Sequence, residues 1–451
     1  GKILGGGHTL TLSIGESARV NESESANVGV LKDISSVNKR NYMGAFASMN
    51  GATVEKLTVD GDVIHYADAP AGFFFGGLAA YSNNSTVTIS DCTTRVNLTL
   101  SGGSVGGSIY VGGFIGHVFG PTFSITRSTL AAKIIHMSGY NIDNNYYRVY
   151  LGGAVGKATP GAKVTFTGNT VSTIIDKKVN TPNARIGGCF GELACSSYVD
   201  VDMTGTKAQN ASITSVSPVS AGGLIGHTVQ RCKLVLDGAW QGTVSSGNAS
   251  VGGLIYDLDG KLTVNTGFSV NGSTFTSNNA TKGILVGDGT NAFVVVNCDP
   301  SGFDNVTAKG FDLFVGKNIT SRASMNVAAT GGLVTVETGA SIGQIPENSG
   351  WYSMISARQN SNTRYYFNIA RLDKAVTNYT PSTVAASPAN VIYWHVYDYV
   401  QGALPDYVRG ESFFTAITDI TGADKAIDMT NYSFYPTKKE GVTFDFSGHK
   451  L

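Results

Sequence analysis

The chain has 451 residues with 32 basic and 32 acidic side chains, and charged residues make up 14% of it, well under the roughly 25% of an average soluble domain. This balance excludes a protein that binds nucleic acid or an anionic membrane through a surplus of positive charge. Glycine is abundant, with 57 residues against 11 prolines, which excludes collagen and a proline-rich linker. The longest apolar run, residues 71–80, is far short of the roughly 20 residues of a transmembrane helix.

A short pattern of two glycines followed by apolar residues recurs through the first 300 residues. Its copies are GAFAS, GGLAA, GGFIG, GGAVG, GGCFG, GGLIG, GGLIY and KGILV, which start at Gly44, Gly76, Gly112, Gly152, Gly187, Gly222, Gly252 and Lys282. Successive copies start 30 to 40 residues apart, 34 on average, and a weaker copy starts at Asp312. A period of this length indicates a repeat architecture.

Each copy is followed by two short segments in which Thr, Val and Ile alternate with polar residues. In chain order, the clearest pairs are residues 85–91 and 95–102, 121–128 and 130–138, 162–169 and 171–177, and 231–238 and 242–247. Alternation with a period of two residues predicts half-buried strands. About three strands in a repeat of this length correspond to one turn of a β-solenoid.

Two other repeat folds have periods in this range. A helical repeat is excluded because each glycine costs about 1 kcal/mol in a helix interior and no unit carries an amphipathic stripe. A β-propeller remains the alternative, since a blade of four strands takes about 40 residues. Units of variable length with about three strands fit a solenoid better. We therefore predict an all-β fold, a right-handed single-stranded β-helix with about three strands per turn.

Three positions of the repeated pattern form columns if successive turns stack about 4.8 Å apart. The second position holds glycine in nearly every copy, which predicts a corner or a close backbone approach. The third position is always apolar and predicts an interior column of Phe46, Leu78, Phe114, Ala154, Cys189, Leu224, Leu254 and Ile284. The sixth position is mostly polar and predicts an outward-facing column of Met49, Tyr81, His117, Lys157, Glu192, His227 and Asp257.

The segment GGLAAYSNNSTVTISDCTT, residues 76–94, resembles the GLUG-motif repeat of bacterial surface and secreted proteins. The opening GGGHTLTL, followed by NVGVLKDISS and MGAFASMNGATVEKLTVDGDV, is similar to the start of such regions. The resemblance covers about residues 1–300. It implies a right-handed β-helix on the exterior of a bacterium and implies no activity, because the motif is structural. The insert at residues 139–148 and the weak pattern after Lys282 depart from the family.

The sequence changes character after about residue 300 and predicts two parts, a β-helix over 1–300 and an aromatic-rich part over 301–451. The aromatic side chains are Trp351, Tyr352, Tyr365, Tyr366, Phe367, Tyr393, Trp394, Tyr397 and Tyr399. We expect an irregular continuation of the solenoid, with a separate capping domain as the alternative. These aromatics could stack on sugar rings, but packing in a core or cap is the favoured interpretation.

The sequence gives no strong candidate for catalysis. Glycoside hydrolysis needs two carboxylates about 5 to 9.5 Å apart across the scissile bond. The acids of the outward column, Glu192 and Asp257, are two turns apart with His227 between them. We therefore predict a mixed ladder of paired surface groups and no catalytic residues. The nucleophile-elbow, zinc-protease and phosphate-loop motifs are also absent from the sequence.

No metal or cofactor site is predicted. His117 and His227 share the outward column but are three turns apart, roughly 14 Å, so they cannot bind one ion, and we expect both to face solvent. The acidic segments 257–260 and 288–289 are predicted to be structural turns, because neither is followed by the further oxygen ligands of a calcium loop.

Five cysteines, Cys92, Cys189, Cys195, Cys232 and Cys298, occur without a C-x-x-C pair. Their number and spacing exclude a disulfide scaffold and disfavour a zinc site. We expect buried free thiols that pack as small apolar groups. A bridge between neighbouring turns remains the alternative if the protein resides in an oxidising compartment.

These observations favour a non-enzymatic extracellular or cell-surface protein, either a structural stalk or an adhesin. A carbohydrate-active enzyme or carbohydrate-binding module that uses the aromatic part is the alternative. Strand-like sequences at both ends, GGGHTLTL and GVTFDFSGHKL, predict head-to-tail pairing with another copy, because an uncapped solenoid end offers an unpaired strand edge. A monomer with covered ends is the alternative there. A glycan or a host surface protein is the other expected partner.

Overall fold

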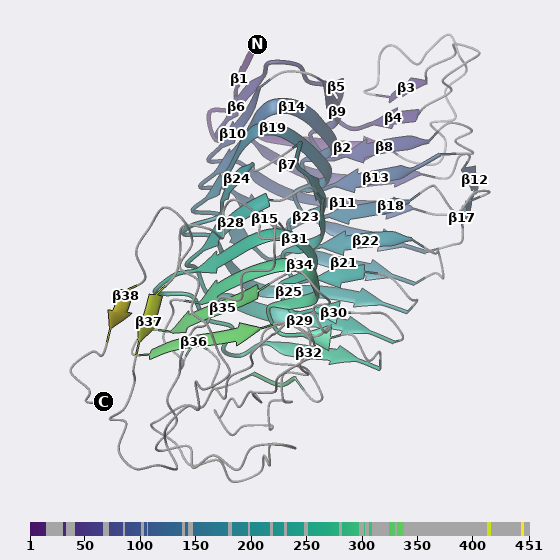
Figure 1. Cartoon of the computed structure of the whole chain (residues 1–451). Coiled ribbons are helices and arrows are strands. Elements are labelled where there is room, and N and C mark those ends of the chain that lie inside the picture. The colour runs from purple at the N-terminus through teal and green to yellow at the C-terminus, as the bar shows by residue number, and fades with distance from the viewer. Residues whose placement is uncertain are drawn as a thin grey trace, which may run out of the picture.

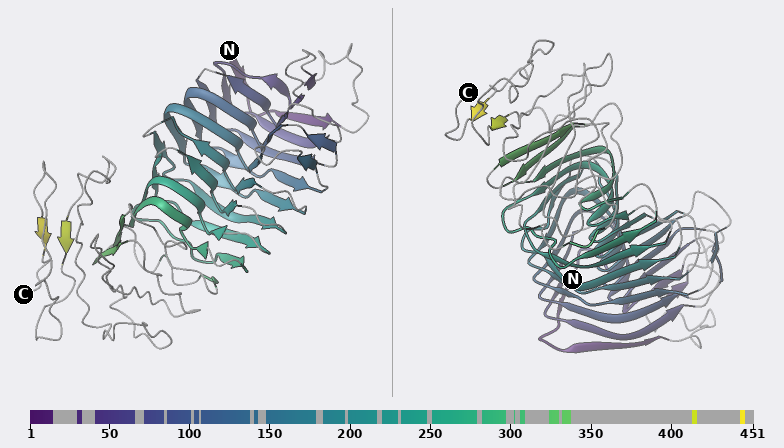
Figure 2. Two further views of the ribbon diagram at one scale, coloured as in Figure 1. Left: turned by 45° about the vertical axis from the view of Figure 1, so that its right-hand side comes forward. Right: turned by 90° about the horizontal axis from the view of Figure 1, so that it is seen from below.

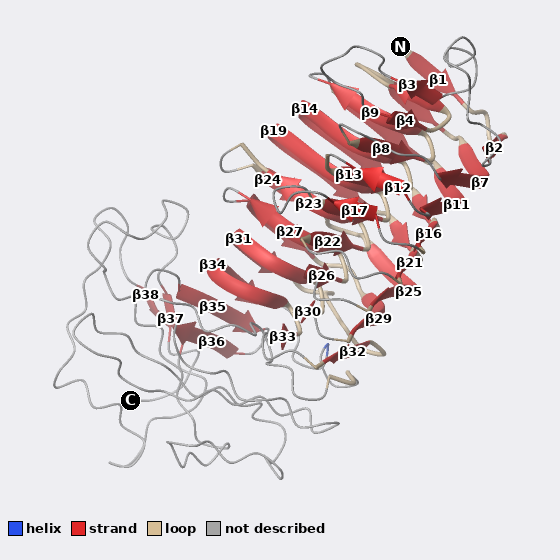
Figure 3. Ribbon diagram, turned by 90° about the vertical axis from the view of Figure 1, so that its right-hand side faces the viewer, coloured by secondary structure: helices blue, strands red, loops and turns tan. Residues whose placement is uncertain are grey.

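The computed structural model describes residues 1–14, 30–32, 41–65, 72–83, 86–100, 103–105, 107–137, 140–142, 148–178, 183–196, 199–216, 220–229, 232–247, 251–278, 282–296, 302, 306–308, 324–329, 332–337, 413–415 and 443–445. Strands of the main coil stack side by side along one axis (Figures 1 and 3). In the view along the coil, the stacked strands form two arms that meet at an angle (Figure 2).

Three long sheets make up the coil, and we call them sheets A, B and C. Sheet A contains 13 strands: β1 (Lys2–Leu4), β5 (Phe46–Ser48), β6 (Thr53–Glu55), β9 (Ala79–Asn83), β10 (Val87–Ser90), β14 (Ile115–Thr126), β19 (Val155–Thr167), β23 (Phe190–Ala194), β24 (Asp200–Asp202), β27 (Ile225–Val229), β28 (Cys232–Leu236), β31 (Ile255–Val264) and β34 (Val286–Val296).

Sheet B contains ten strands: β2 (Thr9–Ile14), β7 (Thr58–His65), β11 (Thr93–Leu100), β15 (Thr129–Leu130), β16 (Lys133–His136), β20 (Thr170–Val171), β21 (Ile174–Lys177), β25 (Lys207–Ser215), β29 (Trp240–Ser246) and β32 (Thr274–Ser277). Sheet C contains nine: β3 (Val30–Lys32), β4 (Asn41–Met43), β8 (Phe73–Gly76), β13 (Ile109–Gly112), β18 (Val149–Gly152), β22 (Ala184–Gly187), β26 (Ser220–Gly222), β30 (Val251–Gly252) and β33 (Lys282–Gly283). Three small pairs complete the described strands: β12 (Gly103–Val105) with β17 (Tyr140–Ile142), β35 (Ser324–Ala329) with β36 (Gly332–Glu337), and β37 (Phe413–Thr415) with β38 (Thr443–Asp445).

Each turn of the coil passes through the three sheets in the same order. The chain leaves sheet C through the glycine pair, runs along sheet A, bends into sheet B and then enters sheet C again. Within the three long sheets, strand pairs are parallel, except for the antiparallel pair of β3 with β4, and they stack in register apart from local shifts in the pairs β14–β19, β25–β29 and β31–β34. The predicted β-helix with three strands per turn is therefore confirmed.

The glycine pair marks a place where successive turns approach too closely for a side chain. A Cβ atom built at Gly77 or Gly113 would collide with the carbonyl oxygen of the next turn's glycine, and the same holds for Gly153, Gly188 and Gly223. The third position of the pattern then points inward, and its residues from Leu78 to Leu254 are buried. Both predictions from the columns are confirmed for the central copies.

The alignment of the first and last copies is wrong by one residue. Phe46 pairs with Ala79 and Ser48 with Tyr81, so Phe46 is 36% exposed and Met49 is buried. At the other end, Gly283 pairs with Gly252, which leaves Ile284 where the other turns have their second glycine. The spacing between copies of the pattern does not reveal that one residue has been lost or gained within the bend.

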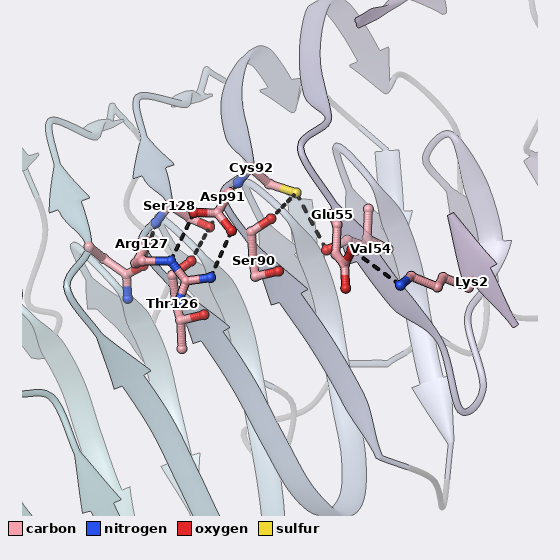
Figure 4. A network of polar contacts seen from close by, with 10 residues as sticks. Lys2, Val54, Glu55, Ser90, Asp91, Cys92, Thr126, Arg127 and Ser128 are labelled. Carbon is pink, nitrogen blue, oxygen red and sulfur yellow. Dashed lines mark hydrogen bonds and ion pairs between the residues drawn. The ribbon is translucent and has the colours of Figure 1, made fainter. Parts of the chain in front are cut away.

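The bend between sheets A and B has a polar outer rim (Figure 4). Asp91 and Arg127 adopt the left-handed backbone conformation there, with φ of 54° and 48°, and their side chains form an exposed ion pair of 2.7 Å. The next residue of each turn points inward, and this buried column holds Cys92, Ser128 and Asn169.

A second buried column, at the end of the sheet B strands, contains basic side chains. His65, His136 and Lys177 lie in one register column with Leu100 between the first two, and all three are at most 2% exposed. Burial lowers the pKa of His65 to about 4 and that of Lys177 to about 7. The sequence pattern gave no indication of this column.

Candidate functional site

The angle between sheets C and A brings outward-facing side chains of the two sheets together outside the coil. Glycines in sheet A allow this approach: a Cβ atom at Gly116 would lie 2.7 Å from the backbone nitrogen of Phe75, and one at Gly226 would lie 2.6 Å from that of Ile186. We call the resulting set the outer corner ladder. Its members from sheet C are Tyr42, Phe74, Tyr110, Tyr150, Arg185 and Ser220, and those from sheet A are Tyr81, His117, Lys157, Glu192, His227, Asp257 and Asp288.

The half of the ladder nearer the N-terminus is aromatic. Ring centroids of Tyr42 and Phe74 lie 5.0 Å apart, those of Phe74 and Tyr110 4.7 Å, and those of Tyr110 and Tyr150 5.0 Å, with the planes within 9° of parallel. The imidazole of His117, from sheet A, stacks on Tyr110 at 4.8 Å. The faces of these rings are therefore covered by neighbouring rings of the ladder. A sugar ring would therefore meet mainly their edges.

The other half of the ladder is ionic. The Lys157 ammonium lies 2.8 Å from Oε1 of Glu192 and 4.9 Å from the centre of the Tyr150 ring. Oε2 of Glu192 lies 3.0 Å from Nδ1 of His227, whose Nε2 lies 3.1 Å from Oδ2 of Asp257. The predicted mixed ladder is confirmed, and it joins four successive turns.

The predicted exposure of this column is wrong for its central members. The Glu192 side chain is 2% exposed and that of His227 13%, because sheet C covers them from the side. A period of two residues shows which way a side chain points from its own sheet. It does not show that another sheet folds against that outer face.

The contacts fix the charge states of the ladder. Burial alone would raise the pKa of the Glu192 carboxyl, but the hydrogen bond from His227 and the charge of Lys157 outweigh it and lower the pKa to about 2. Burial would likewise lower the pKa of His227, but its bonds to Asp257 and Glu192 outweigh that effect and raise it. Glu192 is thus ionised at neutral pH, with both oxygens engaged by neighbouring turns.

The two acidic segments and the two histidines that the sequence singled out all lie in strands of sheet A. Asp257 and Asp259 lie within β31 at an irregularity of the register, and Asp288 lies within β34, so both acidic segments are strand and the predicted turns are wrong. His117 and His227 share one column, as predicted, but both are partly buried. Among the described residues, no three His, Cys, Asp or Glu side chains are close enough to form a metal site.

The cysteine prediction is wrong for one pair. Cys195 and Cys232, 37 residues apart, form a disulfide between neighbouring turns, which is the alternative that the sequence left open. Cys92 and Cys189 are buried free thiols, as expected, and burial raises the pKa of both. Cys298 lies outside the described residues.

Sequence reasoning missed the sheet C half of the ladder. Its members stand two residues before the first glycine of each copy, and from Tyr42 to Tyr150 that position is always aromatic. This recurring aromatic position could have been recognised in the sequence. The aromatic residues from Trp351 to Tyr399 and the copy at Asp312 lie outside the described residues, and only short segments of the second predicted part are described.

Comparison of the chain with models of protein families, with curated proteins and with solved structures found no significant match. The resemblance to the GLUG-motif family therefore stays a prediction. Within the described part of the chain, no helix has the length and apolar character needed to cross a membrane.

Proposed function

We propose that the chain is a non-enzymatic extracellular protein that serves as a structural stalk or adhesin. The observation that carries this proposal is the outer corner ladder, in which side chains from Tyr42 to Asp257 stack on or bind the side chains of neighbouring turns. Outward-facing groups that could hold a substrate are thereby bound to other parts of the same coil. Such contacts favour a stiff rod.

The charge state of the ladder supports a structural role. A glycosidase needs a carboxyl that is still protonated at working pH so that it can donate its proton. Glu192, the most buried acid of the ladder, is held ionised with a pKa of about 2. Its partner across His227, Asp257, accepts a bond from the same imidazole. These acids are arranged as links between turns.

The disulfide supports a location outside the cytoplasm, because such bonds form and persist in oxidising compartments. Cys195 and Cys232 are both buried, as expected of a structural bridge. Together with the resemblance to bacterial surface proteins, this favours the cell exterior. The partners we propose are a second copy joined end to end, and a glycan or host surface protein.

Two measurements test the proposal. Electron microscopy with light scattering over a wide concentration range should show a rod of constant width, and growth in length with concentration would support end-to-end joining. Incubation with a panel of plant, mucin and microbial glycans should leave every glycan intact. Depolymerisation of any glycan by the wild-type chain, abolished in Glu192→Gln, would overturn the structural assignment.

A further inference from the structure

His227 in β27 lies between two carboxylates that belong to the turns before and after it. Its Nδ1 is 3.0 Å from Oε2 of Glu192 in β23, and its Nε2 is 3.1 Å from Oδ2 of Asp257 in β31. An ionised carboxylate only accepts hydrogen bonds. Both ring nitrogens must therefore carry a proton for both bonds to form, and the geometry requires an imidazolium.

The charged groups around the ring balance only when it is protonated. Arg185 faces it from sheet C and acts against its positive charge, and Lys157 binds the far oxygen of Glu192. Asp288 follows Asp257 in the same column. Within the described ladder, an imidazolium gives three cations against three carboxylates, whereas a neutral ring leaves an excess of acid.

The backbone ladder of sheet A is interrupted in the turns that carry Glu192 and His227. The turns before it cross the sheet as the unbroken strands β14 and β19, but the next two turns are each divided, into β23 and β24 and into β27 and β28. β27 pairs with β31 only at Ile225 with Ile255 and at His227 with Asp257. The imidazole bridge therefore lies at a junction where the backbone ladder is short.

We propose that His227 is a pH-sensitive staple, which joins three successive turns as an imidazolium and releases them when it loses a proton. Deprotonation removes one hydrogen bond and turns a ring lone pair toward a carboxylate. Because the pKa of His227 is raised in the folded chain, the stabilisation is complete below the ordinary value of about 6.5 and is lost as pH rises through the raised value. The coil should therefore loosen locally on the alkaline side.

Ring-nitrogen spectra of the whole chain test the charge state directly. With selective ¹⁵N labelling of its seven histidines, the His227 signals, assigned by their loss in His227→Gln, should report two protonated nitrogens. They should persist at a pH above the ordinary titration midpoint of histidine. A His227 ring that titrates at the ordinary midpoint, or that shows a single protonated nitrogen at pH 6, overturns the proposal.

Amide hydrogen exchange tests the release of the turns. After correction for the intrinsic rate, β23, β27 and β31 should lose protection several-fold between pH 6 and pH 9, while β10 and β14 keep theirs. His227→Arg retains a cation and should stay protected at pH 9, whereas His227→Gln should be loose at both pH values. The matched control is His117→Gln in the same column, whose register neighbours are Tyr81 and Lys157, and it should keep the wild-type pH profile. A wild-type profile in His227→Gln overturns the proposal, and if no variant folds, the titration of the unmodified ring decides.

Discussion

The backbone N–H of Cys92 donates a hydrogen bond to the hydroxyl oxygen of Ser128, 3.1 Å away on the next turn. The Ser128 N–H donates in turn to Oδ1 of Asn169 at 2.9 Å, and the Cys92 thiol donates to the carbonyl oxygen of Ser90 at 3.2 Å. At this position of the bend between sheets A and B, a side-chain oxygen thus accepts the bond between turns (Figure 4), while the N–H groups on either side still donate to backbone carbonyl oxygens. Cys92 is therefore part of a hydrogen-bonded polar column, although a buried free thiol was expected to pack as a small apolar group.

Replacement of Asn169 by leucine should destabilise the fold by about 1–3 kcal/mol for each polar group left without a partner. The substitution removes the acceptor of the Ser128 N–H and the donor that binds the Ile125 carbonyl at 3.0 Å. Denaturant unfolding measures the change. Asn97→Ala is the control, because that amide is exposed and binds only Asp62 in the described contacts, and it should change stability by under about 0.5 kcal/mol. Equal effects of the two variants would contradict the role of the buried column.

Removal of the Cys195–Cys232 bridge should lower the free energy of unfolding by about 2–4 kcal/mol, because the bond closes a loop of 37 residues in the unfolded chain. The double variant Cys195→Ser/Cys232→Ser removes the bridge and leaves neither partner behind as an unpaired thiol. Melting with and without reductant provides the measurement. Reductant should lower the melting temperature of the wild type and of Cys92→Ser alike, and have no effect on the double variant. A wild-type melting temperature that does not respond to reductant would show that the bridge is absent or energetically neutral.

Gly153→Ala should prevent folding or cost more than about 4 kcal/mol, a loss expected only from a severe clash. Its Cβ would collide with the carbonyl oxygen of Gly188 and with the Thr173 side chain. Gly161 lies in β19, the strand that follows Gly153, and the nearest atom to its Cβ is 3.4 Å away, so Gly161→Ala should be close to neutral. Circular dichroism melts of the two variants make the comparison. Similar stabilities would mean that the corner is looser than the register indicates.

Lys177→Met should stabilise the chain at pH 7 by about 1–4 kcal/mol, in the range seen when buried charged groups are replaced by apolar ones of similar size. Lys177 is fully buried beside His136, and burial lowers its pKa to about 7. Folding must therefore displace a proton that the unfolded chain holds up to about pH 10.4, and the cost grows as pH falls toward 7. Unfolding at pH 7 and pH 9.5 should show a smaller gain for the variant at the higher pH. A variant that is less stable than the wild type at both values would contradict the prediction.

Much of the coil could be predicted from the sequence because the same constraint acts on every turn. Gly77 and Leu78 have the same surroundings as Gly223 and Leu224, so repetition shows the corner and the interior. The burial of Glu192 could not be predicted this way, since it depends on the angle between two sheets. The sequence left a disulfide between turns open as the alternative but did not identify the pair, because the stacking that brings Cys195 to Cys232 depends on the loop lengths between them.

The direction of the hydrogen bonds gives the coil a definite mechanical character. In all three sheets the bonds between strands run along the axis, since successive turns are the pairing partners. A pull on the two ends would load every bond of one turn-to-turn junction together, and the ring stacks and ion pairs of the outer corner would share that tension. At the junction that holds Cys195 and Cys232, a covalent bond takes over the load once the weaker contacts yield.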